Sequence, residues 1–209
     1  MSSAVGQGLP DDIDPPGRDD GRTSSEEHDM GAIRVHEFTT VDGIVDAPMW
    51  TVDYGFPDDL AASIGGITAP ATGILLGRTT FEMFAPAWST RTAEEDEGAP
   101  FFNDTTKYVV SSTLTDAGSV WRNSTSLGGY DPDRIRELKA DRDLYVSGSA
   151  TLVRALVADG LVDELHLYVY PLAVGQGLRL FPEGTEQKLS LVGVEALSNG
   201  VAHLTYGPA

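Results

Sequence analysis

The chain has 209 residues, which suits a single domain with an appendage rather than two full domains. Acidic residues outnumber basic ones by 32 to 14, giving a formal charge of -18. We therefore expect no nucleic-acid partner and no polybasic membrane anchor, because both depend on clustered Lys and Arg. Cys is absent, which excludes disulfides, thiolate nucleophiles and zinc–thiolate sites. No signal segment is visible, and no apolar run approaches the ~20 residues that cross a bilayer, so a cytoplasmic location is the default expectation.

Residues 1–30 differ in composition from the rest of the chain. They hold eight acidic residues against two basic ones, and Pro, Gly and Ser fill most of the remainder. Such a segment buries too little apolar surface to offset the entropy lost on ordering, so we predict that it is disordered. A tag, or a start codon upstream of Met30, would leave the same pattern. We expect residues 31–209 to form one folded domain.

The first half of this domain predicts two strands, each followed by a loop or a helix. Proline is well tolerated in a first helical turn, paired glycines are typical of a helix end, and Thr79-Thr80-Phe81-Glu82 fits a capping box. In chain order, the expected elements are a strand at Ile33–Phe38, a loop from Asp42 to Phe56, a helix from Pro57 to about Gly65-Gly66, a buried strand at Thr72–Leu76, a helix from Thr79 to Pro86, and a loop over 87–104.

The second half continues the alternation and ends in strands. The expected elements are strands at 107–111, 143–147 and 164–170, edge pieces at 121 and 125–127, helices at 131–140 and 149–158, and two late strands at 188–197 and 200–206. Alternating strands and helices predict a mostly parallel sheet covered on both faces. We therefore predict an α/β fold of three layers, α/β/α, whose central mixed sheet ends in antiparallel C-terminal strands.

One predicted strand end has residues that suit phosphate binding. The strand that ends near Leu76 runs into Gly77-Arg78-Thr79-Thr80. The amides of a new helix and its dipole favour a phosphate there, and the guanidinium could hold one with two hydrogen bonds. The alternative is that Thr79 only caps the helix and Arg78 pairs with a surface acid.

Two further strand ends share this character. Gly148 permits close backbone approach ahead of Ser149-Ala150-Thr151, although Ser149 also suits an ordinary helix cap. Ser111-Ser112-Thr113 places three hydroxyls after another strand, but such residues also form ordinary turns. Ligands of open α/β sheets bind beyond the carboxyl ends of strands, so three such ends together predict a nucleotide with several phosphates. Neither the Gly-rich dinucleotide fingerprint nor a phosphate-loop motif is present.

These segments resemble the dihydrofolate reductase superfamily, and most closely the branch that contains the reductase domain of the bacterial riboflavin-biosynthesis deaminase-reductase. The similarity covers roughly residues 32–206, and it is the order of the motifs that is specific. The motifs are Val41-Asp42-Gly43, Leu75-Leu76-Gly77-Arg78-Thr79-Thr80-Phe81-Glu82, Tyr108-Val109-Val110-Ser111-Ser112-Thr113-Leu114, Gly148-Ser149-Ala150-Thr151-Leu152, Gly160-Leu161-Val162-Asp163-Glu164-Leu165, Pro171, and Gly175-Gln176-Gly177-Leu178-Arg179-Leu180-Phe181.

The resemblance implies an NADPH-dependent reductase that transfers a hydride to a small heterocyclic or carbonyl substrate, as a 5-amino-6-(5-phosphoribosylamino)uracil reductase does. Folate reductases carry two adjacent glycines where this chain has Gly148-Ser149, which leaves the backbone path there open. Lys107 or Arg122 could join Arg78 in attracting the anionic cofactor. The residues implied at the cofactor are Gly77, Arg78, Thr79 and Thr80 at a phosphate, Ser111 and Ser112 at the 2′-phosphate, Gly148, Ser149, Ala150 and Thr151 at the pyrophosphate, and Gly43 and Ile44 at the nicotinamide.

A carboxylate in this family follows a Trp and a Pro, and here Asp59 follows Trp50 and Pro57 with extra residues between. Asp59 is therefore the candidate catalytic residue for holding the substrate ring, with Asp53 and Asp58 as rivals. Acids in a first helical turn also simply complement the helix dipole.

The remaining predictions concern metals, partners and the alternative functions. The four His residues lack the spacing of metal ligands, so we expect no metal site. The apolar strand Leu165–Val169 and the segment Pro171–Phe181 could form the seam of a homodimer, as in the similar reductases. The alternative to an enzyme is a non-catalytic nucleotide-binding or regulatory dimeric module, and the uncertain catalytic carboxylate is what motivates it.

Overall fold

The computed structural model describes residues 30–209, so the predicted disorder of residues 1–30 lies outside the described residues except for Met30. No helix within the described part is both long enough and apolar enough to cross a membrane. The strands are β1 (Ile33–Thr40), β2 (Gly73–Gly77), β3 (Thr106–Val110), β4 (Ser124–Gly128), β5 (Leu144–Ser147), β6 (Glu164–Tyr170), β7 (Leu189–Ala196) and β8 (Ala202–Pro208). The helices are α1 (Asp58–Thr68), α2 (Arg78–Trp88), α3 (Ala99–Asp104), α4 (Pro132–Lys139) and α5 (Ala150–Ala158), with a 3-10 helix at Met49–Tyr54.

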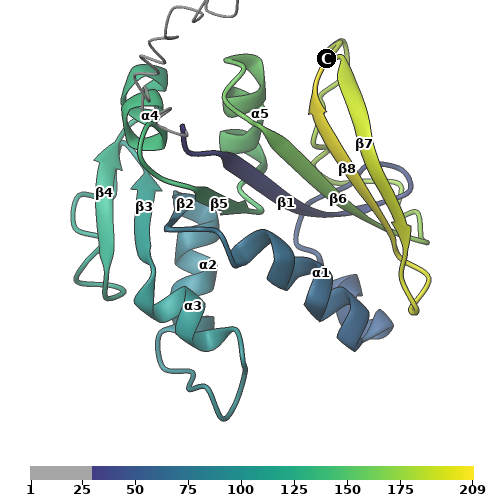
Figure 1. The fold of residues 1–209 in the computed structure, drawn as a ribbon, viewed down its shortest axis with the longest axis horizontal. Helices are drawn as coiled ribbons and strands as arrows, with labels where there is room; N and C mark the ends of the chain where they lie inside the picture. The colour runs from purple at the N-terminus through teal and green to yellow at the C-terminus, as the bar shows by residue number, and fades with distance from the viewer. Residues whose placement is uncertain (1–29) are drawn as a thin grey trace, which may run out of the picture.

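Over residues 30–209 the strands form one eight-stranded sheet in the order β4-β3-β2-β5-β1-β6-β8-β7, which can be followed across Figure 1. Pairing is parallel from β4 through β6 and antiparallel between β6, β8 and β7. The helical connections of the first part carry the chain from one parallel strand to the next, whereas β7 and β8 are joined by a tight turn. The predicted α/β class, with a mixed sheet and antiparallel C-terminal strands, is confirmed.

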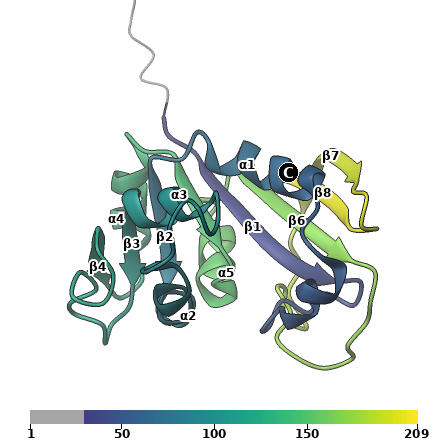
Figure 2. The same cartoon turned by 90° about the horizontal axis from the view of Figure 1, so that it is seen from below.

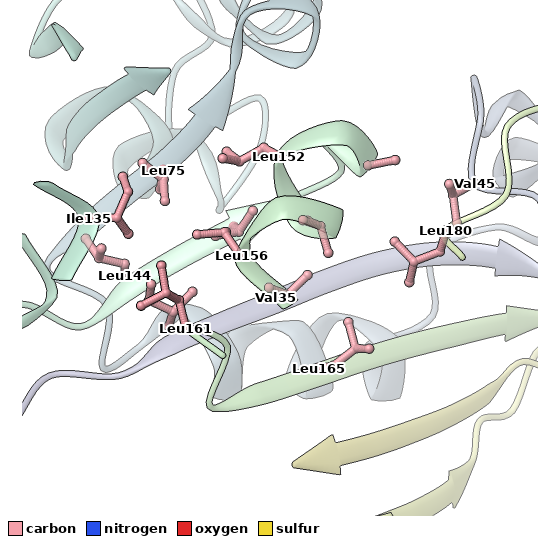
Figure 3. Packing of buried hydrophobic residues seen from close by; sticks show 14 of the residues in the cluster. Val35, Val45, Leu75, Ile135, Leu144, Leu152, Leu156, Leu161, Leu165 and Leu180 are labelled. Carbon is pink, nitrogen blue, oxygen red and sulfur yellow. The ribbon is translucent and has the colours of Figure 1, made fainter. Parts of the chain in front are cut away.

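Two clusters of buried apolar side chains hold the layers together. One lies between the sheet and helices α4 and α5, and Figure 3 shows Leu152 and Leu156 of α5 packed with Val35 of β1 and Leu144 of β5. The other lies on the opposite face, under α1, α2 and α3. Figure 2 shows α1 and α5 on opposite sides of β1. Because both faces of the central strand β2 are covered, its sequence GILLG is apolar throughout. Strand β1 instead buries several polar side chains, among them His36 and Glu37.

The bounds of two predicted helices differ from those in the structure, and tertiary packing accounts for their longer C-terminal ends. Helix α1 runs through the paired glycines to Thr68, since Ile67 beyond them is buried in the core. Helix α2 begins one residue early, at Arg78, and continues past Pro86 to Trp88, whose ring stacks on Phe102 at a centroid distance of 4.3 Å.

Helix α3 falls inside residues 99–104, which the sequence predicts as loop. Its C-terminal end is held from elsewhere in the chain: Lys107 Nζ donates to the carbonyls of Phe102 (2.8 Å) and Thr105 (2.9 Å). The Asn103 side chain adds a hydrogen bond to the Trp88 carbonyl (2.9 Å) and accepts one from Trp121 Nε1 (2.8 Å). Trp88 and Trp121 lie 15 and 18 residues from Asn103 along the chain, so a local pattern could not reveal these contacts.

Candidate functional site

A cavity of about 610 Å³ opens at the carboxyl ends of the parallel strands. Gly77 at the end of β2, Val110 at the end of β3 and Ser147 at the end of β5 all line it, as do residues of β1. Parallel strands that run in the same direction bring their carboxyl ends to one edge of the sheet. The volume lies in the range of small-molecule and cofactor sites.

The N-terminus of α2 forms one wall of this cavity, with Gly77, Arg78, Thr79 and Thr80. The helix has no side-chain cap among the described residues, although the sequence suggests Thr79 for that role. Its first amides therefore remain available, because the first turn of a helix lacks intrahelical acceptors. The Arg78 guanidinium is half-exposed and lies 3.3 Å from Glu82, an exposed pair of the kind that contributes little. A ligand anion can therefore compete for Arg78.

The adjoining part of the wall is the β5–α5 junction, with Gly148, Ser149, Ala150 and Thr151. Gly148 and Ser149 both have positive φ, at 56° and 64°, so the chain follows a path that two glycines would take easily. Ser149 occupies the N-cap position of α5 as predicted, but its side chain does not cap the helix. Its hydroxyl instead accepts a hydrogen bond from the Gly77 amide at 3.0 Å. This contact ties the two phosphate-friendly junctions to each other and holds Ser149 in a conformation that costs a non-glycine residue about 1–2 kcal/mol.

The other predicted cofactor residues do not line the cavity. The Ser111 hydroxyl accepts hydrogen bonds from the amides of Thr113 (3.2 Å) and Leu114 (2.9 Å), so it closes a local turn, and Ser112 beside it is exposed. Gly43 sits in a turn with φ of 80°, and Ile44 is buried against the segment that follows β6. Their neighbours do contribute, since Val110 and residues 45–48 belong to the lining.

Asp59 lies away from the cavity, and so do its rivals Asp53 and Asp58. The Asp59 carboxylate accepts hydrogen bonds from the amide of Ser198 at 2.6 Å and from its hydroxyl at 3.0 Å. The amide of Ser198 contributes most to lowering the pKa of Asp59. The carboxylate thus fastens the β7–β8 turn to α1, and its predicted contact with substrate has no support from this geometry.

Two suggested sources of positive charge are also placed elsewhere. Lys107 is fully buried, donates to carbonyls at the end of α3 and lies 4.5 Å from the centre of the Trp121 ring. Burial lowers the pKa of Lys107 to about 8. Arg122 pairs with Asp104 at 2.8 Å. Among the described residues that line the cavity, Arg78 is the single basic one, so the site has less positive charge than expected.

Glu37 is the residue of the cavity wall that the sequence reasoning missed. It is only 2 % exposed, and its Oε1 has no hydrogen-bond partner within the described part of the chain. Burial raises the pKa of Glu37 to about 8. A signal was present in the predicted strand, where an acid follows Ile33 and Val35 on the face that should be apolar.

The rest of the lining was not among the predicted site residues, because its members come together only when the sheet forms. Val110, Leu152 and Leu178 lie within the motifs of the family resemblance, whereas the others lie outside them. Besides Glu37, these lining residues are Phe38, Val45, Asp46, Ala47, Pro48, Thr51, Met83, Phe84, Val110, Tyr130, Ser147, Leu152, Ala155 and Leu178. Over residues 30–209 no group of three or more His, Asp or Glu is arranged to hold a metal ion.

The order of these strand ends along the chain matches a known family. Residues 32–203 match the family model of the RibD C-terminal domain. The chain belongs to this family. The RibD C-terminal domain match spans β1 to β8, and its fold is dihydrofolate reductase-like, as the resemblance implied.

Individual relatives are distant in sequence. YyaP, an uncharacterized protein of Bacillus subtilis, is 25 % identical over 175 residues, which cover 80 % of this chain and 89 % of YyaP. A putative riboflavin biosynthesis protein from Shewanella has a TM-score of 0.68 at 22 % identity, covering 85 % of this chain and 99 % of that one. The Thermotoga maritima diaminohydroxyphosphoribosylaminopyrimidine deaminase/5-amino-6-(5-phosphoribosylamino)uracil reductase has a TM-score of 0.59 at 15 % identity, covering 86 % and 57 %. At these identities the two structures show the shared fold.

Proposed function

We propose that this protein is an NADPH-dependent oxidoreductase that reduces a small heterocyclic or carbonyl substrate. The observation that carries the proposal is the single cavity flanked by the N-termini of α2 and α5, with Arg78 at one wall. Both helices lack a side-chain cap in the described structure, so two sets of amides face the same space. Membership of the RibD C-terminal domain family supports the same reading.

The residues of the cavity fit the phosphates of a dinucleotide. The positive φ of Gly148 and Ser149 turns the backbone so that the first turn of α5 opens onto the cavity. In this proposal Gly148, Ser149, Ala150 and Thr151 hold the pyrophosphate. Gly77, Arg78, Thr79 and Thr80 hold a further phosphate, where the helix dipole and the guanidinium attract negative charge.

When bound, the reduced dinucleotide supplies the hydride, and the protein supplies position and electrostatics. Phe38, Met83 and Phe84 give the cavity an apolar wall on the side of α2. Such a wall suits a flat ring and excludes water from it. One structural neighbour is named as a 5-amino-6-(5-phosphoribosylamino)uracil reductase, and we propose a substrate of similar kind for this protein.

We also propose that the protein forms a homodimer, but through a different surface from the seam that the sequence predicts. The predicted seam at Leu165–Val169 is paired on both sides within the chain, by β1 and by β8. Exposed apolar side chains gather instead on β7, at Leu191, Val192 and Val194, and such patches favour association. Light scattering at micromolar concentration tests this part, and a monomer would contradict it.

The cofactor is tested by titrating the protein with NADPH and with NADH while following fluorescence. We expect saturable binding, and Arg78→Ala should weaken NADPH affinity about 10- to 100-fold, the effect of losing charge-assisted hydrogen bonds worth ~1.5–3 kcal/mol. Arg136→Ala is the matched control. Arg136 is as exposed as Arg78, at 50 %, and also pairs with an acid on its own helix, but it does not line the cavity. Unchanged affinity in Arg78→Ala, or no binding of either dinucleotide, would reject the proposal.

The alternative of a non-catalytic nucleotide-binding or regulatory module is separated from an enzyme by turnover. The position of Asp59, bonded to Ser198 and away from the cavity, is the observation that favours the alternative. Saturable NADPH binding without oxidation across a panel of heterocyclic and carbonyl compounds would support it. Oxidation of NADPH with any member of the panel would support the reductase.

A further inference from the structure

Glu37 occupies a boundary between the core and the cavity. Alternate residues of a strand share a face, so Glu37 lies on the face of Ile33 and Val35, both members of the cluster under α5. It lines the cavity together with Leu152 and Ala155 of α5. Its side chain is therefore surrounded by apolar groups on the core side and borders the space that a ligand would fill.

The carboxyl group of Glu37 also lacks a partner. Its Oε1 is buried and makes no hydrogen bond to any of the described residues. Buried polar atoms in native proteins nearly always have a partner, and the cavity is the remaining direction from which one can come. A molecule bound in the cavity is thus the expected partner of this carboxyl group.

The charge state of Glu37 follows from its surroundings. Burial alone raises the pKa of Glu37 to about 8, so the group carries a proton at neutral pH. The ionisable groups that face this region are Arg78 on α2, Asp46 after β1, Tyr130 after β4 and Tyr145 on β5. Arg78, the one base among these described groups, is paired with Glu82 at 3.3 Å and does not act as a counter-ion for Glu37.

We propose that Glu37 is the proton donor of the reduction. This inference rests on the proposed function and adds a catalytic residue to it. The electrophilic carbon of a C=N or C=O group in the substrate accepts a hydride from the reduced dinucleotide, which forms a C–H bond and leaves the dinucleotide oxidised. The π electron pair moves onto the nitrogen or oxygen, which takes the proton from the Glu37 carboxyl. The resulting carboxylate regains a proton from water.

Asp59 cannot fill this role in the same way. Its carboxylate already accepts three hydrogen bonds, from the amide and hydroxyl of Ser198 and the amide of Leu60. Those bonds stabilise the ionised form, which lowers the pKa of Asp59. An acid catalyst needs the opposite, a group that still holds its proton at the working pH.

The first measurement compares NADPH oxidation by the wild type, Glu37→Gln and the control Glu137→Gln, which makes the same substitution at an exposed acid of α4 that does not line the cavity. Glu37→Gln keeps the size and polarity of the side chain but has no proton to give. We expect it to lower the single-turnover rate 10²- to 10⁴-fold, with NADPH affinity by fluorescence changed less than threefold. Glu137→Gln should change the rate less than threefold.

The second measurement requires no cofactor and no substrate. In urea unfolding, Glu37→Gln should have the same midpoint as the wild type at pH 4.5 and a higher midpoint at pH 8. The reason is that the unfolded wild-type chain loses the Glu37 proton as pH rises from about 4.5, whereas the folded chain keeps it to about pH 8, so wild-type stability falls across this window.

The pH dependence of the wild type gives a third, variant-free measurement. We expect kcat/KM to fall above about pH 8, as Glu37 loses its proton. A wild type that never oxidises NADPH ends the proposed function and this inference together. An active wild type with an equally active Glu37→Gln ends the role of Glu37 alone. If Glu37→Gln and the wild type had equal urea midpoints at pH 4.5 and also at pH 8, folding would not raise the pKa of Glu37. That result would overturn its role as proton donor as well.

Discussion

The parallel part of the sheet, which carries the cavity, and its antiparallel end both bury ionisable side chains. The two regions differ in how fully those side chains are hydrogen-bonded. At the antiparallel end, His166 of β6 contacts Glu164 at 2.9 Å and His203 of β8 at 3.0 Å. His203 in turn contacts the Ser63 hydroxyl at 3.0 Å. On β1, by contrast, Glu37 Oε1 has no partner among the described residues, and His36 contacts the Tyr145 hydroxyl through Nδ1 at 2.8 Å while its Nε2 has none.

This difference shows what each region is built for. Connected polar groups rigidify a region and remove the penalty of burial, which suits the strands β6, β8 and β7 at this end of the sheet. Unpartnered groups cost stability, and such costs persist mainly at functional sites. The cavity lies at the carboxyl ends of the parallel strands and takes no residue from β6, β7 or β8. In the proposed function, chemistry and structural support are thus separated along the sheet.

The largest effect is expected from packing. Leu156 of α5 is fully buried in the cluster beneath that helix, whereas Leu191 of β7 is 58 % exposed. Leu156→Ala should lower the free energy of unfolding by about 2–5 kcal/mol, and Leu191→Ala should change it by less than about 0.5 kcal/mol. Urea unfolding measures both. Similar losses in the two variants would show that β7 is buried in solution, for example in the proposed dimer.

The next effect compares a buried imidazole without an acidic partner, His36, with one that contacts an acid, His203. Burial lowers the pKa of His36 to about 3, so the folded chain binds fewer protons there than the unfolded chain below pH 6.5. Because of His36, the free energy of unfolding of the protein should therefore fall by about 2 kcal/mol between pH 7 and pH 5. We expect His36→Asn, measured by urea unfolding at both pH values, to remove this loss.

His203→Asn is the comparison variant for that experiment. Burial also lowers the pKa of His203, but its contact with Glu195 acts in the opposite direction. The variant should therefore remove less of the acid sensitivity than His36→Asn does. If His203→Asn removed more, the antiparallel end would be the acid-sensitive part of the molecule, and the comparison would have to be reversed.

The smallest effect tests how the cavity wall is shaped. Ser149 combines a positive φ with a hydrogen bond from the Gly77 amide. Ser149→Gly loses the bond but relieves the strain, so its stability should stay within about 1 kcal/mol of the wild type. Ser149→Ala loses the bond and keeps the strain, so it should be less stable than Ser149→Gly by about 1–2 kcal/mol. Thermal unfolding of the two variants measures this difference. Equal stability of Ser149→Gly and Ser149→Ala would argue against the left-handed conformation of residue 149.

Much of the fold could be predicted because its signals are local. The strand Glu164–Tyr170 has the predicted bounds, and helix α4 begins after Asp131 as predicted, with its side chain accepting from the amides of Asp133 and Arg134. Helix α3 could not be predicted, since the Asn103 side chain that holds it contacts Trp88 and Trp121, which are 15 and 18 residues away. The site divides in the same way: Gly77 and Gly148 follow strands recognisable from their composition, whereas Tyr130 and Leu178 reach the cavity only through the chain path.

The amino-acid sequence already determined the order of strands and helices along the chain and the glycine-containing junctions, because periodicity and turn chemistry act between neighbours in the chain. The order of the motifs also carried the family resemblance. Tertiary structure alone decided which carboxyl groups are exposed and which are desolvated. Asp59 and Glu37 are both acids within predicted elements. Asp59 is hydrogen-bonded to a distant turn, whereas Glu37 is buried beside the cavity. The pKa values of the two carboxyl groups shift in opposite directions because of groups far apart in the sequence. Only folding brings those groups together.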